Sequence, residues 1–296
     1  MTQDRISFII RTTLSRDINY LHRAIASIFT NQYSNIEIII VYQGTQMEKL
    51  EEINTLSLKY PSIKFQVLHN NTNVDERSKN LNLGIKGSTG RFIAFLDDDD
   101  QIMPHYINSI IPKLIESGRA WALCKTLINS SEKKYIVKRI RKFNYIRLLV
   151  SNYICIHAII LDKTKIPAES LHFDENLTSY EDYLLLLNLG RTFSPLFVKA
   201  VLCIYNIENE DVKLSNYKKN KVYIESKKKE IIKSMPLIVK AFLYYKQKER
   251  NSNFIKNAKI AFYRLLAKLV SNEKKFLRIE KKILKYTQVK YENYEI

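Results

Sequence analysis

Short apolar runs, rich in β-branched residues, alternate with helix-like segments through the first hundred residues. Such runs occur at residues 6–10, 36–41, 63–68 and 92–96. Between them, apolar residues recur at spacings of three and four, as in Leu21, Ile25 and Ile28, which is the period of an amphipathic helix. Strands that alternate with helices are typical of βαβ units and of a parallel sheet. The sequence therefore predicts an α/β fold with a Rossmann-like, mostly parallel central sheet flanked by helices.

Weaker signals continue this alternation toward the C-terminal end. Strands are predicted at residues 121–128, 153–161 and 196–205, and helices at residues 104–116 and 179–189. No GxGxxG pattern follows the first strand, so a dinucleotide-binding site is disfavoured. The three cysteines contain no CxxC pair and are expected to be reduced, buried thiols.

Four consecutive aspartates, Asp97 to Asp100, follow directly on the apolar run 92–96. In open α/β sheets, ligands bind beyond the carboxyl ends of the strands. Neighbouring carboxylates raise one another's pKa values unless a cation lies among them, and Mg²⁺ takes carboxylate oxygens together with substrate phosphates. The run therefore predicts a metal-assisted site for a phosphate or a sugar nucleotide. The alternative is a solvated turn with a helix N-cap before Pro104.

The net charge of +18 is concentrated at the C-terminal end of the chain. Residues 211–296 carry 23 Lys+Arg and 8 Asp+Glu, which accounts for +15. We therefore divide the chain into a main domain, residues 1–210, and a basic, helical C-terminal region, residues 211–296. Basic helices with aromatic and aliphatic faces suit an anionic membrane surface, and a solvated appendage is the alternative. No nucleic-acid-binding motif is visible, so a nucleic-acid partner is disfavoured.

The hydropathy pattern bears on the cellular location. No signal-peptide pattern precedes the first strand, and no stretch approaches the ~20 apolar residues of a membrane-spanning helix. We therefore expect a cytoplasmic protein that the basic region could bring to the inner face of the cytoplasmic membrane.

Four segments of the chain together resemble a known family. Residues 89–100, TGRFIAFLDDDD, and residues 77–84, RSKNLNLG, match a strand with a DxD motif and an RxxxLNxG helix. Residues 9–12 and 35–41 match an opening strand and a second strand. In this order they resemble the family 2 glycosyltransferases of the GT-A fold. The resemblance implies a GT-A domain with a C-terminal helical extension, and an inverting transfer of a sugar from a nucleotide-sugar donor, with UDP-sugars favoured and Mn²⁺ or Mg²⁺ on the diphosphate.

The resemblance also implies roles for the aspartates. Asp99 takes the metal position, and Asp97 is a second candidate metal ligand. Asp97 or Asp98 takes the position that contacts the ribose, because the run of four leaves the register open. Asp100 is interpreted as a helix-entry residue before Pro104.

Further donor contacts are expected at the ends of the first two strands and on the RxxxLNxG helix. Arg11 and Arg77 are candidate contacts to the diphosphate or the base, since a guanidinium binds phosphate oxygens bidentately; a structural salt bridge is the alternative. Thr12 takes the place where the family's backbone touches the nucleoside. Many family members carry two aspartates after the second strand, where this chain has Tyr42 and Gln43. Gln43 is a candidate contact to the base because an amide both donates and accepts hydrogen bonds, and Tyr42 either stacks on the base or packs inside the protein.

A second acidic centre lies at residues 179–183, SYEDY, which resemble the family's ED motif. The resemblance implies that Asp182, or as second choice Glu181, is the general base that deprotonates the acceptor hydroxyl. The alternative is a capping box formed by Ser179 and Asp182. Residues 152–157, NYICIH, resemble an N-x-I-P-I-H segment of a bacterial subgroup, which implies a contact of His157 to the donor phosphate or the acceptor; a packed histidine is the alternative.

The resemblance implies a role in bacterial surface polysaccharide synthesis, such as capsule or lipopolysaccharide, with a glycan or lipid-linked acceptor. Two rival functions stay open. One is a catalytically decayed protein that binds nucleotides or membranes. The other, a sugar-1-phosphate nucleotidyltransferase, is disfavoured because residues 11–16 lack the glycines of the phosphate-binding loop that such an enzyme needs.

Overall fold

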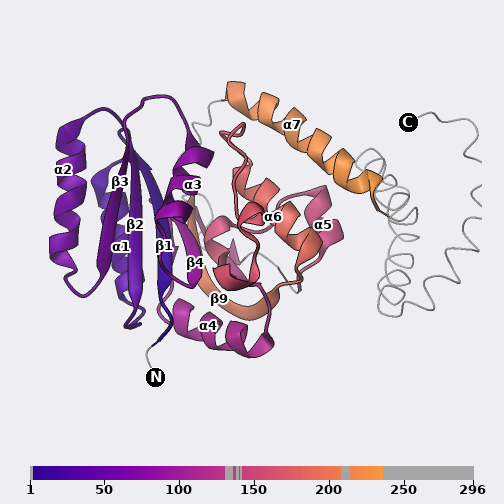
Figure 1. Cartoon of the computed structure of the whole chain (residues 1–296), viewed down its shortest axis with the longest axis horizontal. Coiled ribbons are helices and arrows are strands. Elements are labelled where there is room, and N and C mark those ends of the chain that lie inside the picture. Colours follow the sequence, from indigo (N-terminus) through magenta and orange to yellow (C-terminus); the bar gives the residue numbers. More distant parts are fainter. Residues whose placement is uncertain (1–2, 131–135, 138–139, 141, 208–213, 236–296) are drawn as a thin grey trace, which may run out of the picture. The chain divides into compact units, whose positions relative to one another are not determined.

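The apolar runs of the first half form four parallel strands. In the computed structural model, which describes residues 3–130, 136–137, 140, 142–207 and 214–235, β1 (Ile6–Thr13) lies between β2 (Ile36–Gln43) and β4 (Phe92–Asp97), and β3 (Lys64–Asn70) pairs with β2 (Figure 1). All eight residues of β2 are buried. Strands covered on both faces read as continuous apolar runs, which is why the sequence signal was clear here.

The second half of the chain extends this sheet with mixed pairings. The further strands are β5 (Gln101–Ile102), β6 (Trp121–Ser130), β7 (Ile136–Val137), β8 (Ile159–Asp162) and β9 (Leu196–Ile207). The strand order is β3-β2-β1-β4-β8-β6-β9-β5, with β7 paired to β6. β8 is antiparallel to both β4 and β6, whereas β6 and β9 are parallel. The predicted Rossmann-like sheet flanked by helices is confirmed.

The predicted strand at residues 153–161 is mostly wrong. Only its last three residues belong to β8, and Ile156–Ala158 form a 3₁₀ turn, η2. The run is apolar because it is buried, and a short buried run does not by itself distinguish a strand from a packed loop. The consequence is that Asn152 and His157 lie on irregular backbone, at the edge of a cavity.

The bounds of the helices follow local signals. The α-helices of the described residues are α1 (Ile18–Phe29), α2 (Met47–Thr55), α3 (Arg77–Gly87), α4 (Tyr106–Ser117), α5 (Tyr145–Val150), α6 (Glu181–Thr192) and α7 (Leu214–Lys233), and the other 3₁₀ turns are η1 (Leu56–Lys59), η3 (Lys163–Lys165) and η4 (Ala168–Ser170). Asp17 caps α1 by accepting a hydrogen bond from the backbone of Asn19, and Gly118 ends α4 with a φ of 65°.

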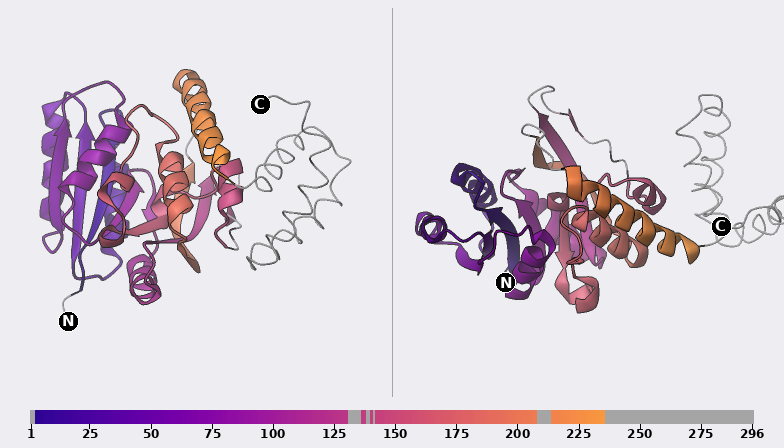
Figure 2. Two further views of the ribbon diagram at one scale, coloured as in Figure 1. Left: turned by 45° about the vertical axis from the view of Figure 1, so that its right-hand side comes forward. Right: turned by 90° about the horizontal axis from the view of Figure 1, so that it is seen from above.

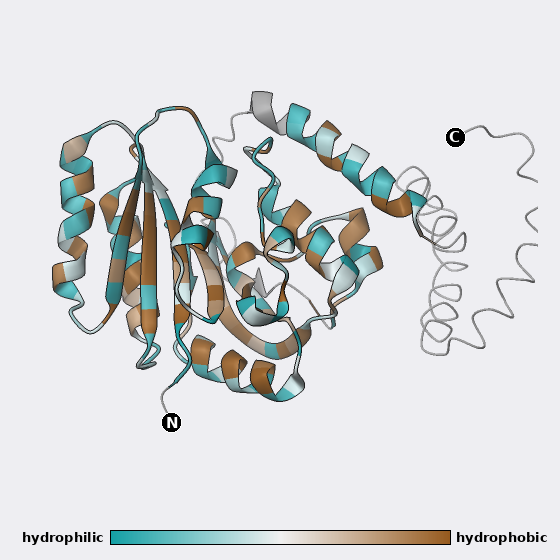
Figure 3. Ribbon diagram, viewed as in Figure 1, coloured by the Kyte–Doolittle hydropathy of each residue, from teal (hydrophilic) through white to brown (hydrophobic). Residues whose placement is uncertain are grey.

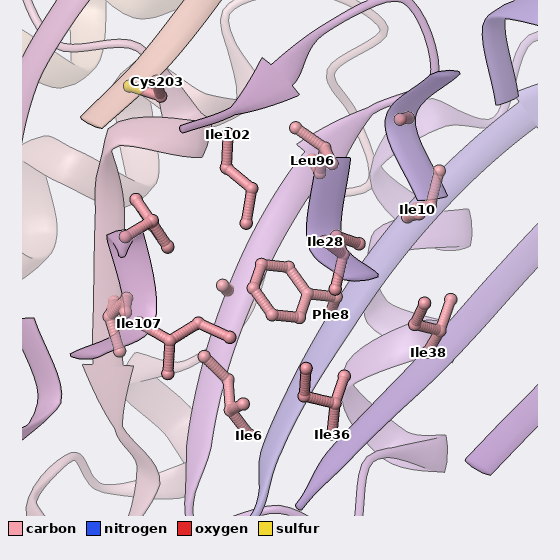
Figure 4. Close-up of a cluster of buried hydrophobic side chains, with 14 of the residues drawn as sticks. Ile6, Phe8, Ile10, Ile28, Ile36, Ile38, Leu96, Ile102, Ile107 and Cys203 are labelled. Carbon is pink, nitrogen blue, oxygen red and sulfur yellow. The ribbon is translucent and has the colours of Figure 1, made fainter. Parts of the chain in front are cut away.

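The main core lies between one face of the sheet and the helices α1 and α4. Phe8 of β1, Ile28 of α1 and Ile107 of α4 belong to one cluster of fully buried side chains (Figure 4). Hydrophobic residues accordingly concentrate on the strands, whereas α7 is mostly hydrophilic (Figure 3). The three cysteines are free and buried, as expected.

Helix α3 packs on the opposite face of the same strands, as the views in Figure 2 make visible. A Cβ atom at Gly84 would lie 2.3 Å from Cγ2 of Ile9, so only glycine allows α3 to approach β1 this closely. Side chains alternate between the faces of a strand. Ile9 and Arg11 therefore share the face that carries α3, whereas Phe8 and Ile10 belong to the core on the other face.

The chain divides into two units, residues 1–224 and residues 225–296. The sheet and the helices α1 to α6 belong to the first unit, and the division falls within α7. The domain boundary predicted at residue 210 lies in the segment 208–213, outside the described residues, and so does most of the predicted basic region, residues 236–296. Within the described part of the chain, no helix is both long and apolar enough to cross a bilayer.

Candidate active site

A cavity of about 270 Å³ opens at the carboxyl ends of β1 and β4. Arg11 and Asp97 are register partners at the ends of these strands, and Nη2 of Arg11 lies 3.1 Å from Oδ1 of Asp97. The cavity is lined by both residues and also by Arg77, Asn152, His157, Glu181, Asp182 and Tyr205. The fold therefore brings six of the predicted site residues, from five separate segments, to one cavity.

The charges of Arg11 and Asp97 depend on each other. Burial alone would raise the pKa of Asp97, but the guanidiniums of Arg11 and Arg77 outweigh burial and lower it. Burial also opposes the charge on Arg11, and Asp97 and Glu181 outweigh it and raise the pKa of Arg11. Both residues are therefore ionised at neutral pH, and they present a fixed pair of charges to the cavity.

The next two aspartates face a different arginine. Oδ2 of Asp98 accepts a hydrogen bond from the hydroxyl of Thr12 at 2.6 Å. Arg16 approaches both carboxylates, with Nε 3.5 Å from Oδ1 of Asp98 and Nη2 2.8 Å from Oδ2 of Asp99. Neither aspartate lines the cavity, but their chain neighbours Asp97 and Asp100 do, so this cluster borders it.

Asp99 has the electrostatic properties of a carboxylate with too little positive charge nearby. Burial, and then repulsion from Asp97 and Asp100, raise its pKa to about 6, and Arg16 offsets only part of this. The described residues contain no group of three or more metal-ligating side chains. The residues present thus fit a Mg²⁺ or Mn²⁺ ion that is held by one or two carboxylates and completed by substrate phosphates, rather than an all-protein cage.

The interpretation of Asp100 as a helix-entry residue is wrong. Its side chain is fully buried, it precedes the short strand β5, and α4 begins only at Tyr106. Oδ2 of Asp100 lies 2.9 Å from Nδ1 of His157, and Oδ1 accepts a hydrogen bond from the backbone N–H of Asn206 at 2.8 Å. Although burial favours the neutral ring, the Asp100 carboxylate raises the pKa of His157 well above its ordinary value. A buried ion pair therefore joins the aspartate run to the segment 152–157.

The second acidic centre begins helix α6. Tyr180, with a φ of 65°, is the N-cap residue and makes no side-chain capping bond, so the capping-box alternative is wrong. Oδ2 of Asp182 accepts a hydrogen bond from Nδ2 of Asn152 at 3.1 Å, and Oδ1 accepts one from the backbone N–H of Tyr183 at 2.7 Å. Burial and the neighbouring Glu181 carboxylate raise the pKa of Asp182 to about 7. A carboxylate whose pKa lies near 7 has the proton affinity that a general base needs.

Arg77 stands at the first position of α3 and faces Glu181. Nη1 of Arg77 lies 3.8 Å from Oε1 of Glu181, and its Nε is buried without a hydrogen-bond partner in the described part of the protein. A third of the Arg77 side chain is exposed. The guanidinium therefore retains the capacity to bind an anion in the cavity.

The predicted RxxxLNxG helix is what fixes the lead-in to α6. Asn82 donates to the carbonyl of Phe173 at 2.9 Å, and its Oδ1 accepts from the N–H of Phe173 at 2.8 Å. The hydroxyl of Ser78 donates to the carbonyl of Leu177 at 2.6 Å. These bonds tie α3 to residues 173–177, which lead into α6, and so place the start of α6 beside the ends of β1 and β4.

Gln43 and Tyr42 lie outside the lining of the cavity. Nε2 of Gln43 donates to the carbonyl of Val74 at 2.6 Å, and Oε1 accepts a hydrogen bond from Asn80 at 2.5 Å. Tyr42 is fully buried and stacked on His69, so the packed alternative applies to it. The amide of Gln43 holds the loop before α3, and its contact to a nucleotide base stays a prediction.

Sequence reasoning missed Arg16, Asn152, Tyr180 and Tyr205 as site residues. Asn152 was part of a segment singled out for His157, so a signal existed for it. Arg16 follows the first strand by three residues, and only the position of this loop at the same sheet edge as the aspartates could have indicated it. Tyr180 belongs to the segment 179–183, which was singled out for Glu181 and Asp182, so a signal existed for it as well, whereas Tyr205 lines the cavity from a strand that carries no distinctive pattern.

Comparisons with known proteins address the family. Residues 7–170, more than half of the chain, match the family described as Glycosyl transferase family 2. An uncharacterized glycosyltransferase of Rickettsia prowazekii is 29% identical over 195 residues, which cover 62% of this chain and 58% of that protein. An uncharacterized glycosyltransferase of Methanocaldococcus jannaschii is 26% identical over 228 residues, 73% of this chain and 75% of that protein.

Solved structures agree with the fold. S. aureus TarS 1–349, in complex with UDP-GlcNAc, superposes with a TM-score of 0.60 at 16% identity, over 71% of this chain and 61% of that one. This likeness concerns the arrangement of strands and helices. The chain thus matches 58% of the Rickettsia protein and 61% of the TarS fragment in length.

Proposed function

The chain belongs to glycosyl transferase family 2, and from this premise we propose that it transfers a sugar from a nucleotide-sugar donor to a hydroxyl group of a glycan or lipid-linked acceptor. One observation carries the proposal. A single cavity joins two carboxylates of the aspartate run, those of Asp97 and Asp100, with two guanidiniums and the Glu181–Asp182 pair. Transfer needs these two functions side by side, one to bind a departing diphosphate and one to remove a proton from the attacking hydroxyl.

On the acceptor side, Asp182 is the proposed general base. Asn152 and the N–H of Tyr183 each bind one of its oxygens, and these bonds orient the carboxylate. Its pKa of about 7 means that about half of the molecules carry the ionised, proton-accepting form at neutral pH. Glu181 is the second candidate, and its approach to Arg77 instead suits it to hold that guanidinium in the cavity.

On the donor side, the guanidiniums of Arg11 and Arg77 are proposed to bind the diphosphate. Asp99, with Asp97 as a second ligand, would hold Mn²⁺ or Mg²⁺, and the bound ion would supply positive charge that stabilises the departing nucleoside diphosphate. Asp98, fixed by Thr12, is proposed to contact the ribose.

The proposed chemistry is a single displacement. Asp182 takes the proton of the acceptor hydroxyl as its oxygen bonds to the anomeric carbon, and the bond from that carbon to the diphosphate breaks. One displacement inverts the anomeric configuration. We favour a UDP-sugar as donor, and the TarS structures with UDP and UDP-GlcNAc support this choice.

Two variants test the function in an assay of transfer and of UDP binding by thermal shift. Asp182→Asn is expected to lose activity by about 10²- to 10⁴-fold and to keep UDP binding, because only the base is lost. Asp99→Asn is expected to lose both activity and the Mn²⁺ dependence of UDP binding. Glu169→Gln, at an exposed carboxylate, is the matched control.

Three outcomes separate the possibilities. Wild-type transfer by both variants would refute the proposed site. Nucleotide binding by the wild-type protein without transfer to any acceptor would favour a decayed enzyme. Formation of a nucleotide sugar from a sugar 1-phosphate would favour the nucleotidyltransferase.

A further inference from the structure

Arg16 lies in the loop between β1 and α1 and holds the two aspartates that border the cavity. Its Nη2 is 2.8 Å from Oδ2 of Asp99, and its Nε is 3.5 Å from Oδ1 of Asp98. The side chain of Arg16 is 41% exposed, whereas those of Asp98 and Asp99 are 6% and 19% exposed. A solvent-accessible arginine thus pairs with two largely buried carboxylates, and its single charge offsets only part of theirs.

The other two aspartates have different partners. Asp97 pairs with Arg11, and Asp100 pairs with His157. Both of these cations are far less exposed than Arg16, at 17% and 1% of their side-chain areas. Arg16 is therefore the cation of this cluster that can leave its carboxylates for solvent at the smallest cost in packing.

A divalent ion and Arg16 compete for the same oxygen. Nη2 of Arg16 lies 2.8 Å from Oδ2 of Asp99, so a divalent ion that bound this oxygen would come close to the guanidinium, and two cations repel at such short range. A guanidinium released from a carboxylate finds an equivalent bidentate partner in a phosphate, because both present paired oxygens of matching geometry.

We propose that Arg16 pairs with Asp98 and Asp99 until the donor binds, and that it passes to the donor's diphosphate when a divalent ion takes its place on Asp99. The inference rests on the proposed function, because the diphosphate is that of the nucleotide-sugar donor. It makes metal and nucleotide binding interdependent: the ion binds weakly to the free protein and tightly once a nucleoside diphosphate draws Arg16 away.

The test is a titration of Mn²⁺, with free Mn²⁺ followed by electron paramagnetic resonance, with and without UDP. Arg16→Gln is expected to bind Mn²⁺ roughly three- to tenfold more tightly than wild type in the absence of UDP, since the competing cation is gone. The same variant is expected to bind UDP about tenfold more weakly in the presence of Mn²⁺. Arg16→Lys keeps the positive charge but lacks the bidentate guanidinium. Its affinities for Mn²⁺ and for UDP are expected to lie between those of wild type and of Arg16→Gln.

Arg119→Gln is the matched control, because Arg119 is an exposed arginine whose Nη1 donates to the carbonyl of Ser194. It should bind Mn²⁺ and UDP as wild type does, and a thermal unfolding curve checks that each variant is folded. Equal Mn²⁺ affinity of wild type and Arg16→Gln without UDP, including no binding by either, overturns the role of Arg16. Failure of the wild-type protein to bind any nucleoside diphosphate instead overturns the proposed function.

Discussion

The hydrogen bond from Asn152 to Asp182 gives the sharpest prediction. Nδ2 of Asn152 lies 3.1 Å from Oδ2 of Asp182, and the only other recorded donor to this carboxylate in the described residues is the N–H of Tyr183. A hydrogen bond to a charged group contributes about 1.5–3 kcal/mol, and one pKa unit corresponds to ~1.4 kcal/mol. Asn152→Ala is therefore expected to raise the pKa of Asp182 by about one unit, from about 7 to about 8.

The sign of the kinetic effect follows from the role of the carboxylate. Only ionised Asp182 accepts a proton, so activity falls as the pH drops below its pKa. At pH 7 the ionised fraction decreases from about one half to about one tenth, and kcat/KM decreases roughly fivefold. Above pH 9 Asp182 is ionised in both proteins, and their kcat/KM values should agree within about twofold.

The assay is the pH profile of kcat/KM, which reports the pKa of the free enzyme. Asn108→Ala serves as control, because Asn108 also donates one hydrogen bond, to the carbonyl of Asn31 at 3.1 Å, and does not line the cavity. If the acidic limb of Asn152→Ala coincides with that of wild type, Asn152 does not tune the base, or Asp182 is not the base.

Three further predictions concern stability and the metal. Glu37 is fully buried, accepts hydrogen bonds from Ser7, Lys64 and Thr89, and has a pKa lowered to about 2 because these bonds outweigh burial. Glu37→Gln is expected to lower the free energy of unfolding, measured in urea above pH 5, by about 1–3 kcal/mol. The difference from wild type should vanish as the pH falls from 4.5 toward 2, because Glu37 is then protonated in the folded protein as well. A difference that persists at pH 2 would contradict this account. Gly84→Ala, whose Cβ would meet Ile9 at 2.3 Å, is expected to lower the free energy of unfolding by about 1–3 kcal/mol, whereas Gly87→Ala, with a nearest contact of 3.1 Å to a flexible leucine methyl, should lower it less. Chelation of divalent ions is expected to abolish transfer until Mn²⁺ or Mg²⁺ is restored, and full activity in EDTA would refute metal dependence.

The parallel half of the sheet and its motifs were predictable from the sequence. The strands β1, β2 and β4 are buried on both faces, so apolar residues follow one another in them, and such runs are visible in the sequence. The helix with Asn82 and Gly84 was identified through the resemblance of its RxxxLNxG motif. The structure gives each residue a geometric role: Asn82 makes a pair of hydrogen bonds with the backbone of Phe173, and Gly84 allows close packing on β1.

Only the tertiary structure determined which partner each aspartate has. The four aspartates are chemically identical and consecutive, yet Asp97, Asp98 and Asp100 face Arg11, Thr12 and His157, respectively. These partners are distant in the sequence, as the separation of 86 positions between Thr12 and Asp98 illustrates. The register of β1 and β4 brings the first two pairs together, and the 3₁₀ turn η2 brings His157 to Asp100. A local pattern records what each residue's neighbours require, whereas the ionisation and orientation of a carboxylate depend on charges and donors that only the folded chain places beside it.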